Sequence, residues 1–270
     1  MSRKTFGSVG SLCLLVGACA APAESSLDVG PARPPAPITL FAEWQPVVSS
    51  TYDFMNRHVE VAEIMSAGAR TPEATYAPEV FLPLLPSERK AVGDVWTIDV
   101  SDVLPFLRQL HPSATPKLRH VGSAVEGGRA TLLSRTREEL EVLLRVHCEF
   151  ELVAREMYLL PAQFEGRLLW DRVVREPKAF HLALPPRDTN FDVSYGRSVD
   201  IGFIPRMQVA SANARPARDD ANGARARLRE AFYGPQVEWR PLGDALARAQ
   251  ESGKRLHVMQ LFGTLDDESC

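Results

Sequence analysis

The sequence is poor in cysteine and has no excess of charge of either sign. Its 270 residues include four cysteines, and 31 basic residues stand against 34 acidic ones, giving a net charge of −3. No basic stripe with interleaved aromatic residues occurs, so the electrostatic footprint of a nucleic-acid-binding protein is missing. We therefore exclude nucleic acid as a partner. With 45% apolar residues, the chain is long enough for one large or two modest domains.

Common catalytic signatures are also missing. The sequence contains no G-x-S-x-G elbow, P-loop, G-x-G-x-x-G or H-E-x-x-H motif. The six histidines do not follow the spacing of zinc ligands. The stretch Asp-Asp-Ala-Asn-Gly at 219–223 fails the ligand spacing of a calcium-binding loop. The sequence therefore predicts no metal site and gives no support to a hydrolase or a metalloenzyme.

The first 37 residues are typical of an exported protein. A positively charged start precedes a short apolar stretch at 6–18, which is too short to span a bilayer as a helix. Its end, Leu15-Val16-Gly17-Ala18-Cys19, resembles a bacterial lipobox, in which the cysteine thiol receives diacylglycerol. We predict a signal peptide at 1–19 with lipidation at Cys19, followed by a disordered tether at 20–37 rich in Ala, Pro and Ser.

This interpretation places the protein in the bacterial cell envelope, on the periplasmic side, held to the membrane by its N-terminal lipid. The alternative is an ordinary cleaved signal peptide and a secreted protein, since small residues also surround Cys19 at the spacing of a cleavage site.

Residues 38–210 favour strands. The clearest pattern is 140–152, where apolar residues alternate with mainly charged ones, which predicts an antiparallel strand with one solvated face. Cys148 lies on its apolar face, so we expect a buried and inert thiol. Further strands are predicted at 94–100, 167–174, 178–184 and 199–205, and helices at 51–67 and 101–110. The spacing of these short strands indicates a sandwich or an open antiparallel sheet.

The pattern changes after residue 210. Residues 211–235 are predicted to be a linker with a short helix at 224–232. In 236–270, a helical stripe of Leu and Ala ends at Gly253, and 256–262 is an apolar run typical of a strand buried on both faces. A helix, a central strand and then a polar loop with a cysteine form the opening of a thioredoxin-like domain. The predicted fold class is therefore α+β: a β-rich N-terminal domain followed by that opening helix and strand.

Three stretches, in the same order along the chain, resemble the selenoprotein N family. They are Pro161-Ala162-Gln163-Phe164-Glu165-Gly166, Val199-Asp200-Ile201-Gly202-Phe203-Ile204-Pro205-Arg206-Met207, and Gly263-Thr264-Leu265-Asp266-Asp267-Glu268-Ser269-Cys270 with 237–246 ahead of it. The last stretch is similar to the segment of that family that leads into its redox motif Ser-Cys-Sec-Gly. Together, the similar stretches cover about residues 90–270.

The resemblance implies a thiol/selenol-disulfide oxidoreductase that acts in redox homeostasis on thiol or disulfide proteins. Cys270 would be the catalytic cysteine, Ser269 and Gly263 would shape its loop, and a selenocysteine would follow Cys270 directly, encoded by UGA. A selenol ionises more readily than a thiol and would exchange with disulfides, with Cys270 as the resolving partner. No cofactor beyond that selenocysteine is expected.

Two expectations limit this interpretation. Without its selenol neighbour, Cys270 stands beside Asp266, Asp267 and Glu268, whose charges raise the pKa of a thiol and make it a poor nucleophile. The calcium-binding element of animal members of the family has no counterpart in the sequence, so a calcium role is not carried over. The alternative function is a non-enzymatic envelope lipoprotein that binds a protein partner, with Cys270 inert.

Overall fold

The computed structural model describes most of the chain between residues 33 and 256. The described residues are 33–51, 57–66, 68–69, 71–111, 127–185, 189–196, 198–214, 221–233 and 240–256. The predicted signal peptide at 1–19, the lipidation site Cys19 and most of the predicted strand at 256–262 lie outside them. Within these ranges, no helix combines the length and the apolar character that crossing a bilayer requires.

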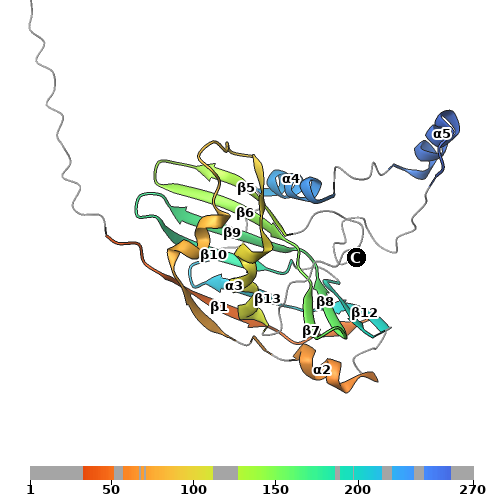
Figure 1. The fold of residues 1–270 in the computed structure, drawn as a ribbon, viewed down its shortest axis with the longest axis horizontal. Coiled ribbons are helices and arrows are strands. Elements are labelled where there is room, and N and C mark those ends of the chain that lie inside the picture. The colour runs from red at the N-terminus through yellow and green to blue at the C-terminus, as the bar shows by residue number, and fades with distance from the viewer. Residues whose placement is uncertain are drawn as a thin grey trace, which may run out of the picture. The chain divides into compact units, whose positions relative to one another are not determined.

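Two antiparallel sheets dominate the described chain (Figure 1). The eight-stranded sheet has the order β3 (Glu73–Tyr76), β1 (Ile38–Trp44), β13 (Met207–Ser211), β10 (Glu176–Ala183), β9 (Phe164–Asp171), β6 (Glu139–Val146), β5 (Gly128–Arg135) and β4 (Val95–Ile98). The five-stranded sheet has the order β2 (Ser49–Ser50), β12 (Ser198–Phe203), β11 (Phe191–Tyr195), β8 (Met157–Pro161) and β7 (Phe150–Val153). The predicted α+β class, dominated by an N-terminal β-rich part, is confirmed.

The prediction of one continuous strand at 140–152 is wrong. The chain forms β6 and β7, which belong to different sheets and are separated by 147–149. At the break, the backbone N–H of His147 donates to the carbonyl of Gly127 (3.1 Å), a residue outside both strands. Cys148 remains buried inside the break. The alternation of apolar and charged residues in the sequence continues through the break and does not reveal it, although 142–146 and 148–152 are all buried in the structure.

Aromatic packing fills the inner face of the larger sheet. Helix α3 (Val100–Leu110) and the 3₁₀ helix η1 (Pro78–Leu84) cover this face. The ring centroid of Phe180 on β10 lies 4.5 Å from that of Phe106 on α3 and 5.3 Å from that of Phe81 on η1. Rings at these distances bury large apolar areas and add a specific aromatic attraction. The sequence placed α3 correctly to within one residue.

The start of α3 explains why one predicted strand is too long. The carboxylate of Asp99 accepts hydrogen bonds from both the backbone N–H (2.9 Å) and the hydroxyl (2.8 Å) of Ser101. This N-cap satisfies a donor in the first turn of the helix, and it lowers the pKa of Asp99 through those hydrogen bonds. The predicted strand at 94–100 therefore ends at Ile98, where β4 ends.

Helix α4 (Asn222–Tyr233) lies on the outer face of the larger sheet, beside β5 and β6 (Figure 1). Its Ala224 and Leu228 form a small cluster with Leu143 of β6, and all three are buried. Each buried leucine contributes about 1.5–3 kcal/mol to stability. The predicted helix at 224–232 is confirmed, but its packing on the sheet was not predicted. The expectation of a solvated face on β6 is wrong at Leu143, which α4 covers, and at Arg145, which is also buried.

The other two predicted helices are also found. Helix α2 (Val59–Ser66) lies within the predicted range 51–67. Helix α5 (Leu242–Ser252) ends at Gly253, which has φ = 63°, in the left-handed region that favours glycine after a helix. The predicted strands at 167–174, 178–184 and 199–205 correspond to β9, β10 and β12, with ends shifted by one to three residues.

Candidate functional site

The structure does not place the predicted redox residues. Cys270, Ser269 and Gly263 lie outside the described residues, as does Cys19. Cys148 is the described cysteine, and its side chain is 1% exposed in the link between β6 and β7. Burial, helped by the charge of Glu149, raises the pKa of its thiol far above the usual range. Cys148 therefore stays protonated near neutral pH and is a structural residue, as the sequence predicted.

Two of the stretches that resemble selenoprotein N are crossings between the sheets. In Pro161–Gly166, the chain leaves β8 of the smaller sheet and enters β9 of the larger one. In Val199–Met207, it leaves β12 of the smaller sheet and enters β13 of the larger one. Both stretches therefore join the two sheets.

A single buried residue, Asn190, ties the two crossings together. Its backbone carbonyl accepts from the N–H of Ala162 (2.8 Å), and its own N–H donates to the carbonyl of Gly202 (2.9 Å). Its side-chain amide donates to the carbonyl of Ile204 (2.7 Å), while its Oδ1 accepts from the N–H of Ile204 (2.8 Å). Asn190 is 1% exposed. It therefore satisfies backbone groups of both crossings where water has little access.

The crossings also carry close contacts that restrict residue type. A Cβ atom at Gly202 would lie 2.5 Å from Cζ of Phe191 and 2.5 Å from the carbonyl oxygen of Ser49. At Gly166 the nearest atom would be Cδ1 of Leu182, at 3.0 Å. The side chain of Gln163, in the first crossing, accepts a hydrogen bond from the buried guanidinium of Arg145. These residues hold the architecture, and none of them presents a nucleophile.

A cavity of about 310 Å³ opens on the outer face of the larger sheet, between β9, β10 and the segment that follows β13. The residues that line it are of three kinds: potential cations, an asparagine and apolar residues. The lining residues are Arg167, Leu169, Lys178, Ala179, Phe180, His181, Asn213 and Ala214. We call this the outer cavity.

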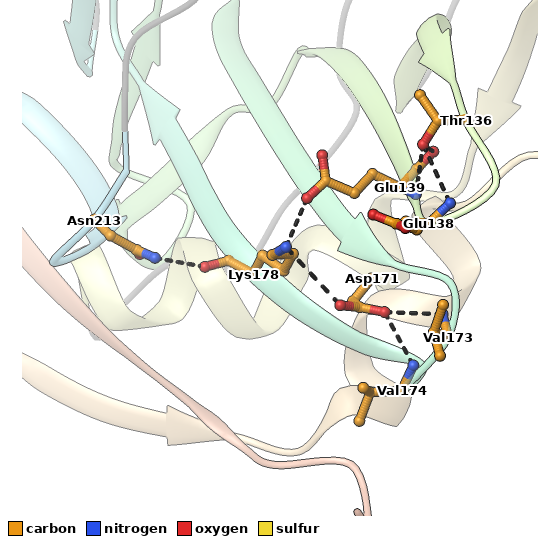
Figure 2. Close-up of polar contacts among 8 residues, drawn as sticks. All are labelled: Thr136, Glu138, Glu139, Asp171, Val173, Val174, Lys178 and Asn213. Atoms are coloured by element: carbon orange, nitrogen blue, oxygen red, sulfur yellow. Dashed lines mark hydrogen bonds and ion pairs between the residues drawn. The ribbon is translucent and has the colours of Figure 1, made fainter. Parts of the chain in front are cut away.

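Lys178, at the edge of the outer cavity, is the centre of a polar network (Figure 2). Its Nζ lies 2.6 Å from Oε1 of Glu139 and 3.9 Å from Oδ2 of Asp171. The hydrogen bond to Glu139 raises the pKa of Lys178. Asn213 donates from Nδ2 to the carbonyl of Lys178 (2.7 Å). Lys178 is thus held through both its ammonium group and its backbone.

The two turns beside Lys178 are fixed by side-chain oxygens (Figure 2). Oδ1 of Asp171 accepts from the N–H groups of Val173 (2.8 Å) and Val174 (2.9 Å) in the β9–β10 turn. Oγ1 of Thr136 accepts from the N–H groups of Glu138 (3.2 Å) and Glu139 (2.9 Å) in the β5–β6 turn. These bonds replace backbone pairing in the turns and set the positions of the carboxylates that hold Lys178.

Arg167 and His181 lie side by side in the cavity wall. They are register partners on β9 and β10. Arg167 forms an ion pair with Glu141 of β6. Burial lowers the pKa of His181, against the opposing effects of a hydrogen bond to Gln208 and the charge of Glu165. His181 is therefore neutral near pH 7.

Sequence reasoning missed the outer cavity. The predicted strands at 167–174 and 178–184 contain six of its lining residues, and alternation places 167, 169, 179 and 181 on outward-facing positions. The pairing of β9 with β10 was the missing signal, since it alone brings Arg167 next to His181. Among the described residues, no group of three His, Cys, Asp or Glu side chains could hold a metal ion.

Comparisons with known proteins identify a relative over most of the chain. Selenoprotein N from Homo sapiens is 26% identical over 88% of this chain and 53% of its own length. The Mus musculus protein is 23% identical over 86% of the chain and 55% of its own length, and the Danio rerio protein 26% identical over 71% and 46%. No protein-family model and no solved structure matches the chain.

The human and mouse matches cover 88% and 86% of this chain, which takes in most of its β-rich part. The chain spans about half the length of the curated relatives it matches. The chain is therefore a selenoprotein N-like protein, related to selenoprotein N over most of its own length.

Proposed function

We propose that this chain is part of a thiol/selenol-disulfide oxidoreductase of the cell envelope that acts in redox homeostasis on thiol or disulfide proteins. The observation that carries the proposal is the similarity to selenoprotein N over 71–88% of the chain. The relatives are selenoproteins by name, and the terminal stretch 263–270 is similar to the segment that precedes the family's selenocysteine.

The state of Cys148 supports Cys270 as the reactive residue. Cys148 is buried and protonated, so it cannot attack a disulfide in the folded protein. Cys13 belongs to the predicted signal peptide, and Cys19 is the predicted lipidation site, which would hold the protein on the periplasmic side of the membrane. Cys270 is the cysteine that remains for exchange chemistry, and Ser269 and Gly263 would shape its loop.

The proposed step conserves electrons. Reduction of a substrate disulfide to two thiols takes up two electrons, which Cys270 and an adjacent selenol supply as their sulfur and selenium become bonded. The selenol, ionised at neutral pH, supplies the attacking or leaving group. An external dithiol reductant then restores the reduced pair. Cys270 acts as the resolving residue in this scheme.

A comparison of two cysteine variants tests the proposal. In the protein that contains the selenocysteine, we expect Cys270→Ser to reduce thiol-disulfide exchange to the background rate, because the resolving thiol is lost. Cys148→Ala is the matched control, and it should retain exchange because its thiol does not react in the folded state. The measurement is the rate of reduction of a disulfide-linked fluorescent peptide. Unchanged activity in Cys270→Ser would overturn the proposal and favour the non-enzymatic lipoprotein.

The selenocysteine is testable in the gene. We expect the codon after that of Cys270 to be an in-frame UGA, followed by a glycine codon, continued open reading frame and a downstream hairpin. Sequencing the source DNA through that position provides the measurement. UAA or UAG at that codon would contradict the expectation and leave Cys270 without its proposed partner.

A further inference from the structure

We propose that the outer cavity binds a small organic anion, in which an apolar group carries a carboxylate or a phosphate. The cavity lies on the outer face of β9 and β10, among described residues, and its lining contains no cysteine. The proposal is independent of the exchange chemistry assigned to Cys270, so each can fail without the other.

The charge distribution around the cavity favours an anion. Arg167 and Lys178 line it, whereas no carboxylate appears among its described lining residues. The acids that pair with these cations, Glu141 with Arg167 and Glu139 and Asp171 with Lys178, are not among the lining residues. The charged groups that line the cavity are therefore cationic.

The same ion pairs fix the cations in position. The side chains of Arg167 and Glu141 are only 17% and 19% exposed, so this pair is more shielded from solvent than a typical surface pair. A guanidinium carries five N–H donors and can bind a carboxylate or phosphate in addition to its ion-pair partner. Because the side chain is already held, binding an anion immobilises little more of the protein.

Neutral groups complete the polar part of the cavity. The amide of Asn213 is oriented by two contacts, since Nδ2 donates to the carbonyl of Lys178 and Oδ1 contacts the hydroxyl of Ser211 (2.9 Å). Its Nδ2 carries a second N–H. The neutral imidazole of His181, held by its hydrogen bond to Gln208, adds an uncharged polar group to the wall. The second N–H of Asn213 suits an oxygen of an anion and gives the site direction as well as charge.

The remaining lining explains why the anion should be organic. Leu169, Ala179 and Ala214 provide an apolar surface beside the cations. A cavity of about 310 Å³ is at the lower end of the range for small-molecule sites. It has room for a group the size of an aromatic ring together with its acid, so an inorganic ion alone would leave the apolar surface uncovered.

Three probes of similar size test the recognition of charge. Benzoate and phenyl phosphate carry an anion on a ring, and benzamide is the uncharged counterpart of benzoate. The test is to titrate each compound into the full chain and to measure its binding by calorimetry. The expected result is saturable binding of at least one anion, about tenfold or more tighter than benzamide, the factor for one charge-assisted hydrogen bond. The tighter of the two anions identifies carboxylate or phosphate as the preferred group. Equal binding of benzamide, or no saturable binding of either anion, would overturn the proposal.

Matched variants test the location. Arg167→Gln should weaken anion binding by about tenfold. Arg206→Gln is the control, because it also breaks an ion pair, with Glu43 (3.3 Å), but does not line the cavity. Ala179→Leu enlarges a lining side chain while leaving every charge in place, and it should also weaken binding by about tenfold. It tests the location even if Arg167→Gln fails to fold. A melting curve checks each variant. Equal effects of Arg167→Gln and Arg206→Gln, or full affinity in Ala179→Leu, would place the anion elsewhere.

Discussion

Replacing Asn190 with alanine is expected to lower the free energy of unfolding by about 2–5 kcal/mol. The side chain of Asn190 satisfies both the N–H and the carbonyl of Ile204, at 2.8 and 2.7 Å. Asn190 and Ile204 are 1% and 0% exposed, so water cannot readily replace these bonds. Each buried polar group left without a partner costs about 1–3 kcal/mol, and alanine leaves two. Denaturant unfolding monitored by circular dichroism measures the loss.

The matched control is Asn213→Ala, which removes another asparagine amide that donates to a backbone carbonyl. That bond, to Lys178, is exposed to solvent, so water can replace it and the loss should be about 1 kcal/mol or less. A smaller effect at Asn190 than at Asn213 would show that the two crossings do not depend on this residue.

The position of Asn190 gives a structural reason for two of the three stretches that resemble the selenoprotein N family, 161–166 and 199–207. Residues 161–166 and 199–207 contain the turns between sheets, buried backbone groups and glycines in close contact with neighbouring side chains. Few residue types satisfy such constraints, whereas an ordinary half-buried strand position accepts many. The similarity in these stretches therefore reflects the fold, whereas the proposed redox function would depend on the terminal stretch 263–270.

Periodicity alone predicted several elements well. Helix α3 and the strands β9, β10 and β12 follow from regular apolar spacing and local turn signals. Gly253 marked the end of α5 because a left-handed residue commonly follows a helix. These features depend on neighbours in the sequence, which is the information that a pattern contains.

Periodicity and local turn signals could not predict the contacts between residues far apart in the sequence. The alternation at 140–152 continues across the break between β6 and β7, so it could not show that the chain changes sheets. Leu143 is covered by Ala224 and Leu228 of α4, which lie about 80 positions later in the sequence. The outer cavity needs the register of Arg167 with His181. Cys270, by contrast, was singled out by resemblance to a family and not by any contact.

Gly202→Ala is the second substitution with a large expected effect, and its cause is steric. The added Cβ would lie 2.5 Å from Cζ of Phe191 and 2.5 Å from the backbone oxygen of Ser49, both closer than a Cβ can approach. Phe191 is fully buried, so its ring has little room to move. The strands must therefore separate, which also strains the bond from Asn190 to the carbonyl of Gly202. We expect a loss of about 3 kcal/mol or more in the free energy of unfolding.

Two other glycines give a graded control for this steric argument. A Cβ at Gly166 would meet Cδ1 of Leu182 at 3.0 Å, and one at Gly68 would meet no atom within 4 Å. That Cβ would also lie 3.1 Å from the backbone oxygen of His181. These contacts are longer than the 2.5 Å contacts at Gly202, so Gly166→Ala should cost less than Gly202→Ala. Gly68→Ala should change stability by no more than about 0.5 kcal/mol. Thermal and urea unfolding of the three variants would establish the order, and a Gly202→Ala protein as stable as Gly68→Ala would mean that β12 can move away from β2 and β11 at little cost.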